Sequence, residues 1–444
     1  MKSLSALSPR NRNRIASAAI VVGIILVIAV TWWNAPSRKV DHLVGAVATQ
    51  PPLAAIAPQA ADPSWVPRRL EPLWAQDIEP RSDVDATMVR PEPIVVGEVL
   101  LLPEAQGVQA INIADGSPRW HYRRDIALCA LSTSHERVLA TFDGPAGCGE
   151  TVSLEPDTGA YAATRRSTVT HDDDAGPAAA IRSNSYAGIY TNKFLELWRS
   201  DLVRVVEYGQ VPANNEPGFQ PNAECGIVSA LTRLEFLAVL NDCSGSARLV
   251  LQSAKPEKSR EPEVAATVEL GPLSHDLALV AIAEDAVALR HNDTLTVYRG
   301  DGTRLDSYAL PPVAPSALAA LGELSLGGKN QQITDLPHHM AWFSERGLLG
   351  LRPTNLDVGF HVADAVGTPA AWGRHLFIPL DGAVAVWDGD AVVEIGTLEL
   401  PRGAAAPASA GSPAAQSTPV HLATAGNVLL VERGNRVEAF TIVP

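Results

Sequence analysis

Two kinds of hydrophobic pattern divide the chain. Near the N-terminus, residues 15–33 form one continuous apolar run in which Ser17 and Thr31 are the only polar side chains. A helix of this length would span about 28 Å, which is close to the thickness of the hydrocarbon core of a bilayer. From about Leu70 onward, short runs rich in β-branched residues alternate with Gly, Asp, Asn and Pro. The pattern therefore predicts one transmembrane helix followed by an all-β body.

The flanks of the apolar run predict its orientation. Residues 1–14 contain no acidic side chain and four cations, which are Lys2, Arg10, Arg12 and Arg14. Because positive flanks stay in the cytoplasm, we expect a single-pass protein of the inner (plasma) membrane, with a cytoplasmic N-terminus and an extracytoplasmic (periplasmic) C-terminal domain. A cleaved signal peptide is the alternative. It would need a shorter apolar stretch and an adjacent cleavage site, whereas the first Ala-x-Ala after the run lies at 46–48.

The remaining composition predicts the domain boundaries. Residues 34–69 are rich in Ala and Pro and lack periodicity, so we interpret them as a tether between the helix (15–33) and the body (70–444). Residues 401–419 form a low-complexity stretch that cannot bury a core, and we expect a mobile surface loop there. The basic tail at 1–14 completes the organisation.

The body contains a recurring unit of hydrophobic strands and polar turns. Its recurring hydrophobic segments lie at 95–103, 135–142, 186–192, 233–240, 283–290, 345–352, 372–379 and 425–432. Their mean spacing of about 47 residues is typical of a four-stranded β-propeller blade, although the steps are uneven. We expect seven blades, with eight as the next choice. A β-sandwich is the alternative, and it would need two or three such domains in a body of this length.

Turn residues and the two ends of the body support a closed ring. Asp-Gly or Asp-Thr-Gly stands between two strands at 115–116, 157–159, 301–302 and 388–389, where a hairpin favours a positive φ. The segment 70–80 has the character of an isolated outer strand, and the final segment 420–443 is one strand short of a blade. Pairing these two segments would close the ring and remove exposed sheet edges.

Four cysteines are consistent with the expected compartment. Cys129 and Cys148 are 19 residues apart, and Cys225 and Cys243 are 18 apart. No Cys-x-x-Cys or zinc-finger spacing occurs, so two disulfides in an oxidising compartment are favoured over a zinc site. Four cysteines allow three connectivities; we favour Cys129–Cys148 and Cys225–Cys243, because each pair then lies within one repeat.

Charge excludes one class of partner. The chain has 35 Lys and Arg against 49 Asp and Glu, and its net charge is −14. All of the acidic excess lies outside the basic tail. Nucleic-acid binding needs a clustered positive surface, so we expect no nucleic-acid partner.

One repeat resembles a known family. The stretch VQAINIADGSPRW (108–120) resembles the PQQ-like β-propeller repeat. The whole layout is similar to a family of actinobacterial membrane-anchored envelope proteins, and the residues that carry this similarity are 147–159, 196–225 and 375–389. The resemblance implies a role in trafficking of a glycolipid, similar to trehalose monomycolate, with an inner-membrane transporter or envelope-assembly proteins as partners.

Known catalytic and cofactor patterns are missing from the sequence. No G-x-S-x-G, H-E-x-x-H or Gly-rich phosphate loop occurs, so we expect no catalytic residues, and the absence of adjacent cysteines argues against a bound quinone. The run of Asp172, Asp173 and Asp174 could ligate a cation, but a solvated turn is favoured. His338 and His339 are adjacent and would point to opposite faces of a strand, so joint metal binding is disfavoured. We expect no metal and no cofactor.

The segment 198–208 carries the candidate ligand-binding residues. Trp198, Arg204 and Tyr208 mix aromatic and charged character and lead into a proline-rich loop at 209–223, so they could line a site for a sugar headgroup. An outer blade strand with cross-strand ion pairs is the alternative.

The sequence thus favours a non-enzymatic β-propeller that binds partners as a scaffold in cell-envelope assembly. The alternative is a propeller enzyme of the quinoprotein, hydrolase or lyase type, with a central metal or cofactor site.

Overall fold

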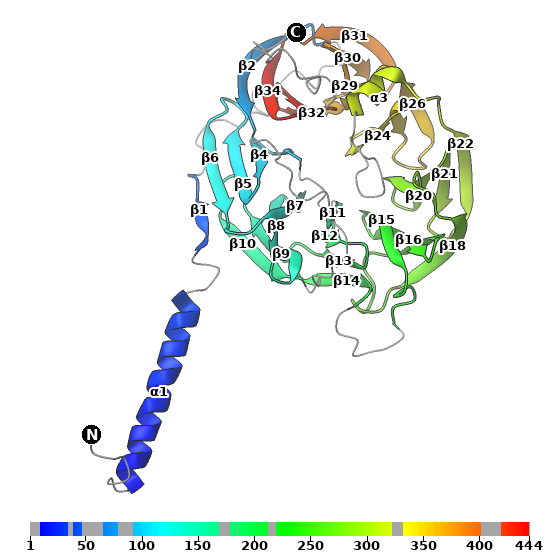
Figure 1. The fold of residues 1–444 in the computed structure, drawn as a ribbon. Helices are drawn as coiled ribbons and strands as arrows, with labels where there is room; N and C mark the ends of the chain where they lie inside the picture. The colour runs from blue at the N-terminus through cyan, green and yellow to red at the C-terminus, as the bar shows by residue number, and fades with distance from the viewer. Residues whose placement is uncertain are drawn as a thin grey trace.

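The computed structural model describes residues 9–33, 39–46, 65–78, 92–167, 178–183, 185–211, 219–321, 332–400 and 419–443. Within these residues the chain has a long helix, α1 (Pro9–Trp33), a short helix, α3 (Pro315–Leu321), and eight β-sheets of four or five strands. Figure 1 shows the sheets arranged around one axis as the blades of a β-propeller. The all-β propeller that the sequence predicted is confirmed.

In blades 1 to 4, four consecutive strands follow one another from the axis outward. Blade 1 has an additional outer strand, β1, which pairs with β6. Blade 1 contains β3 (Ile94–Val96), β4 (Val99–Glu104), β5 (Gly107–Asn112), β6 (Pro118–Arg123) and β1 (Asp41–Leu43). Blade 2 contains β7 (Leu128–Ser134), β8 (Arg137–Gly144), β9 (Gly147–Leu154) and β10 (Tyr161–Arg166). Blade 3 contains β11 (Ala179–Arg182), β12 (Ala187–Tyr190), β13 (Phe194–Trp198) and β14 (Arg204–Gly209). Blade 4 contains β15 (Gly226–Arg233), β16 (Phe236–Cys243), β17 (Ser246–Ser253) and β18 (Val264–Pro272).

Blades 5 to 8 complete the ring. Blade 5 contains β19 (Ala278–Ile282), β20 (Ala286–His291), β21 (Thr294–Arg299) and β22 (Arg304–Ala309). Blade 6 contains β23 (Gln332–Asp335), β24 (Met340–Ser344), β25 (Gly347–Leu351) and β26 (Val358–Val362). Blade 7 contains β28 (Ala370–Trp372), β29 (His375–Leu380), β30 (Ala383–Asp388) and β31 (Val393–Glu399). Blade 8 contains β32 (Val420–Ala425), β33 (Val428–Arg433), β34 (Arg436–Val443) and β2 (Arg69–Asp77), with β27 (Gly367–Thr368) parallel to β32.

The blade count is eight, which was the next choice after seven, so the first expectation of seven is corrected. Each of the eight recurring segments lies in a different blade, so the seven steps between them separate eight units. The segment 345–352 falls on β25, the third strand of its blade, whereas the next segment, 372–379, falls on a second strand, β29. This difference explains the short step between them and the uneven spacing along the sequence.

The ring is closed by strands from opposite ends of the body. β2 pairs antiparallel with β34, from Arg69 opposite Val443 to Asp77 opposite Arg436, and Figure 1 shows the two strands side by side. Leu70 on β2 is buried in the cluster that includes Phe440. The predicted pairing of the first and last segments is confirmed, and it supplies the fourth strand that blade 8 lacks.

The core lies between neighbouring blades. A cluster of buried side chains joins Val99 and Trp120 of blade 1 to Val138 and Leu154 of blade 2, and similar clusters join other neighbours. Second strands such as β20 are almost entirely buried, whereas outer strands such as β22 are mostly exposed. A second strand packs against blades on both of its faces, which is why the recurring segments are continuous apolar runs rather than alternating ones.

The Asp-Gly hairpins connect third and fourth strands at all four sites, and at three of them the turn glycine has the predicted positive φ. Gly116, Gly159 and Gly302 have φ values of 72°, 69° and 85°, which glycine adopts without the steric cost of a Cβ. At 388–389 the structure differs, because Val392 has the positive φ of 55°. The Asp388 carboxylate there accepts hydrogen bonds from the amides of two later residues, so the turn is longer.

Two tryptophans connect neighbouring blades, one between blades 8 and 1 and the other between blades 1 and 2. Trp74 Nε1 on β2 donates to the Ile113 carbonyl in blade 1 at 2.8 Å, and Trp120 Nε1 on β6 donates to the Pro156 carbonyl in blade 2 at 2.7 Å. Each indole lies against a turn glycine; a Cβ on Gly159 would lie 2.6 Å from the Trp120 ring. The tryptophan of the PQQ-like repeat therefore serves as an inter-blade contact.

Part of the expected tether is built into the ring. β1 lies within 34–69 and pairs antiparallel with β6, and Trp65 packs against Trp372 of blade 7 with ring centroids 4.6 Å apart. Only residues 34–38 separate the end of α1 from the docked segment 39–46. The Asp172 to Asp174 run and the low-complexity stretch up to residue 418 lie outside the described residues.

Candidate functional site

The N-terminal helix has the properties of a membrane span. Residues Asn13–Trp33 have a mean hydropathy of 2.6 and are not buried against the ring. An apolar helix that is exposed on all sides in water is typical of a segment that lipid covers, or of a signal sequence. Its topology and the identity of its membrane stay predictions.

The three candidate ligand-binding residues lie in the blades rather than on an open face. Trp198 and Tyr208 are each 1% exposed, and Arg204 is partly buried. Trp198 lies opposite Arg204 on the paired strands β13 and β14. Burial leaves the two aromatic rings no surface to offer a sugar, so their positions favour a structural role over the headgroup site that the sequence suggested.

A cluster of buried charges surrounds these residues. Glu196 on β13 and Glu207 on β14 lie directly opposite each other, with 0% and 3% of their side chains exposed. Two carboxylates in cross-strand positions repel, and three arginines offset this repulsion. Arg165 of blade 2 pairs with Glu196, Arg204 Nη1 lies 2.8 Å from Glu207 Oε1, and Arg260 Nε lies 3.5 Å from Glu207 Oε2.

Burial also shapes the electrostatics of this charge cluster, defined as Arg165, Glu196, Arg204, Glu207 and Arg260. Desolvation raises the pKa of Glu207 above its ordinary value, while Arg204 and Arg260 act to lower it. With every member ionised, the cluster has one more cation than anions. Its members come from blades 2 and 3 and from the segment before β18, so it joins three consecutive blades.

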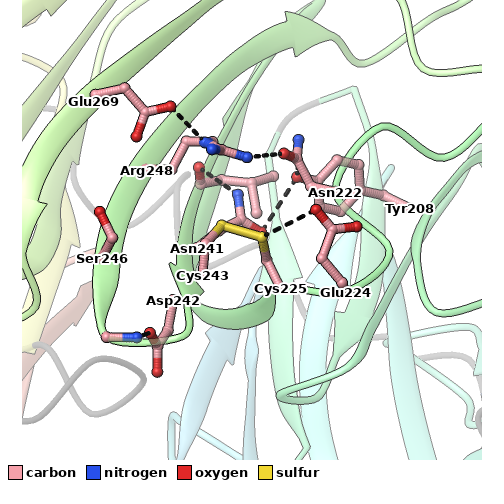
Figure 2. The surroundings of a disulfide bond; sticks show 12 residues. Tyr208, Asn222, Glu224, Cys225, Asn241, Asp242, Cys243, Ser246, Arg248 and Glu269 are labelled. Carbon is pink, nitrogen blue, oxygen red and sulfur yellow. Dashed lines mark hydrogen bonds and ion pairs between the residues drawn. A yellow bond between two sulfur atoms is a disulfide. The ribbon is translucent and has the colours of Figure 1, made fainter.

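A second polar network lies beside the Cys225–Cys243 disulfide (Figure 2). Tyr208 Oη donates to Asn241 Oδ1 at 3.2 Å and accepts from Asn222 Nδ2 at 3.1 Å. Arg248 Nη1 donates to Asn222 Oδ1 at 2.9 Å, and its Nε donates to Glu269 at 2.7 Å. Burial raises the pKa of Tyr208 to about 12, so the hydroxyl stays protonated at neutral pH and donates within this network.

These two networks hold the arm 219–225, which leads into blade 4. Gln220 Nε2 donates to the Glu207 carbonyl at 3.0 Å and to the Arg260 carbonyl at 2.9 Å. The Cys225 amide donates to the Asn222 carbonyl at 3.1 Å, and its Sγ forms the disulfide. The arm is thus attached to blades 3 and 4 by side-chain, backbone and covalent contacts.

Both disulfides have the connectivity that the sequence favoured. Cys129 and Cys148 join β7 and β9 within blade 2, and Cys225 and Cys243 join the arm to β16 within blade 4. Each closes a loop of similar length, so the chain-entropy model assigns each about 3 kcal/mol of stabilisation.

The two disulfides predict different local effects on removal. Replacing Cys225 and Cys243 by alanine should lower the free energy of unfolding by about 3 kcal/mol and expose the arm 219–225 to hydrogen exchange. The matched control, Cys129→Ala with Cys148→Ala, should cost a similar amount and leave exchange in the arm unchanged. Equal protection of the arm in both variants would show that the disulfide does not hold it.

The acidic and histidine side chains of the described residues do not gather into a metal site. Among the residues that the structure describes, no group of three or more His, Cys, Asp or Glu could hold a metal ion. His338 Nδ1 lies 3.3 Å from Asp390, whereas His339 is buried against Phe360, and this burial lowers the pKa of His339. The two histidines therefore face different surroundings. The carboxylates of the charge cluster are already engaged by arginines.

Sequence reasoning missed the two glutamates and the polar residues of the arm. Glu196 stands in the wholly buried strand FLELW, and an acidic residue inside a short apolar run is a signal that could have identified it. Asn222 and Arg248 carry no such signal, because their partners come from other strands.

Comparisons with known proteins show likeness in overall architecture only. No family model and no curated protein matches the chain. Among solved structures, BamB from Moraxella catarrhalis has a TM-score of 0.46 and 11% identity, covering 84% of this chain and 99% of its own. Dihydro-heme d1 dehydrogenase NirN in complex with DHE has a TM-score of 0.40 and 12% identity, covering 70% of this chain and 66% of its own. The actinobacterial envelope family expected from the sequence is not confirmed by these comparisons.

Proposed function

We propose that this protein is a membrane-anchored binding protein of the cell envelope, which holds a rigid propeller at the extracytoplasmic surface and presents it to protein partners. The observation that carries the proposal is the docking of residues 39–46 onto blade 1, five residues after the apolar helix α1 ends. A short connection keeps the ring at high effective concentration for other proteins of the same membrane.

The construction of the ring supports a display role. Two disulfides, a closed set of blades and buried ion pairs make a body that changes shape little on binding, and such preorganisation lowers the entropic cost of association. Disulfides persist in oxidising compartments, which agrees with an extracytoplasmic ring. Catalysis forms no part of the proposal.

The finer form of the proposal concerns cargo. The layout resembles that of mycobacterial polar growth factor A, and on this resemblance we propose that the partners include an inner-membrane transporter and that the cargo is a glycolipid similar to trehalose monomycolate. The buried positions of Trp198 and Tyr208 mean that such a ligand would bind elsewhere on the ring.

Anchoring and topology can be tested in membranes of a bacterial host. The full chain should resist extraction by alkaline carbonate, and external protease should reach the ring but not the basic tail. A variant without residues 1–33, exported behind a cleavable signal, should be recovered as a soluble protein. Release of the full chain by carbonate would contradict the anchor.

The binding role can be tested with a photo-crosslinking residue on an exposed outer strand, for example at Val393 of β31. We expect crosslinks to a defined membrane protein in the full chain, and loss of these crosslinks in the soluble variant.

Native mass spectrometry of the detergent-extracted protein tests the cargo. A co-purified glycolipid supports trafficking, whereas a tightly held metal ion without lipid would favour an enzyme.

A further inference from the structure

The segment that follows α1 is attached to the outer rim of the ring by ion pairs. Lys39 Nζ lies 3.0 Å from Asp125 Oδ2, and the Asp41 carboxylate lies 3.1 Å from His121 Nε2 and 3.6 Å from Arg123 Nη1. These partners stabilise the ionised form of Asp41, and its pKa lies below the ordinary value, chiefly because of the His121 hydrogen bond. Backbone pairing of Asp41–Leu43 with β6 adds to these contacts.

Aromatic contacts attach the same segment to blade 2. The His42 ring packs edge-on against Tyr122 and Tyr161, with centroids 5.2 and 4.8 Å away, and its Nε2 lies 2.8 Å from the Gly159 carbonyl oxygen. The Gly45 amide donates to the Thr158 carbonyl at 2.9 Å. Residues 39–46 therefore bridge β6 and the turn between β9 and β10.

Chain length then limits where this rim can lie. Six Cα–Cα steps connect Trp33 to Lys39, and a fully extended chain spans about 21 Å over that interval. With β1 undocked, the next described contact with the ring is at Trp65, and a fully extended chain from Trp33 to that residue spans about 110 Å. The docked strand therefore holds one particular edge of the ring close to the end of the apolar helix, as the position of β1 in Figure 1 illustrates.

The rim also exposes apolar side chains. Leu43, Val44 and Tyr161 are 53%, 51% and 52% exposed, and Tyr161 is in contact with His42. Tyrosine is enriched at membrane interfaces, because its ring is apolar and its hydroxyl is polar. The rim cations Lys39, Arg119 and Arg123 are paired with acidic side chains. The contact of the rim with lipid would therefore depend on its apolar side chains.

We propose that the rim formed by residues 39–46 and the β9–β10 turn rests on the surface of the membrane that α1 enters, with Leu43, Val44 and Tyr161 among the lipid headgroups. The inference depends on the proposed function only through the membrane insertion of α1. It assigns an orientation to the ring: blades 1 and 2 face the lipid, and blade 5 faces away.

The test uses the full chain in lipid nanodiscs and a fluorophore on a single added cysteine. Asp157→Cys places the label in the β9–β10 turn, where that side chain is 65% exposed, and Leu305→Cys places it on β22 of blade 5. Lipids with a nitroxide on the headgroup should quench the label at 157 several-fold more than the label at 305. Equal quenching at the two positions would overturn the proposal.

An undocking variant separates the role of β1 from that of the helix. His42→Ala should weaken the attachment of the segment, and quenching at 157 should then fall towards that at 305, while circular dichroism confirms an intact ring. Unchanged quenching at 157 would show that docking of β1 does not hold the rim at the membrane. Failure of the chain to stay in nanodiscs would instead contradict the membrane anchor, so the two failures are distinguishable.

Discussion

Replacing Leu70 by aspartate is expected to open the ring and to lower the free energy of unfolding by more than about 4 kcal/mol. Leu70 is 6% exposed and lies on β2, opposite Ile442, in a cluster that also contains Phe377 and Val384 of blade 7. A carboxylate at this position would be buried without a partner. Among the strands that the structure describes, β2 is the one from the N-terminal side of the body that pairs with β34, so its release removes the closure of blade 8.

Leu73→Asp is the matched control on the same strand. Leu73 is 42% exposed, so its carboxylate would remain in water, and stability should change little. The free energy of unfolding of both variants can be measured by denaturant unfolding of the full chain in detergent, followed by tryptophan fluorescence. Trp74 on β2 lies next to the substituted position and can report on it. Similar losses in the two variants would show that the closure does not depend on the buried face of β2.

Glu196→Gln is expected to give the second large effect, a loss of roughly 3 kcal/mol in the free energy of unfolding. The glutamine keeps the shape of the side chain but removes the charge that faces Arg165 and Arg204. Because these guanidiniums are mostly buried, their desolvation is no longer offset. Ser167, which donates to the Glu196 carboxylate, would also lose an ionised acceptor.

Asp201→Asn is the appropriate control, since it breaks an ion pair with Arg199 on the surface of the same blade. Both side chains of that pair are more than half exposed, and we expect little or no loss of stability. Unfolding of the two variants at neutral pH distinguishes a buried cluster from ordinary surface charge. An equal, small effect in both would contradict the structural importance of the charge cluster.

The sequence predicted those features that depend on local pattern. The apolar run, the Asp-Gly hairpins and the paired cysteines each have a signal within about twenty residues, and the structure has α1, positive φ at three of the four turns and both disulfides. The closure by β2 and β34 is a long-range contact that could nevertheless be predicted, because an isolated strand and an incomplete blade remain when the repeats are counted.

Features that depend on partners from other blades could not be predicted. β1 has only three residues and lies between Ala- and Pro-rich stretches, so nothing in its own sequence indicates that it pairs with β6. Two of the three arginines that pair with Glu196 and Glu207 come from β10 and from the segment before β18, and an alternating pattern on one strand cannot show them. Seven blades were preferred to eight for a related reason, since one recurring segment falls on a third strand rather than a second.

The pairing of Arg69 with Val443 has a consequence for biosynthesis. β2 is translated long before its partner strand, β34. Throughout that interval the nascent chain carries a sheet edge that lacks its partner strand, and this edge is available to neighbouring copies. Prematurely terminated chains are therefore expected to associate or be degraded, even when most of their blades are complete.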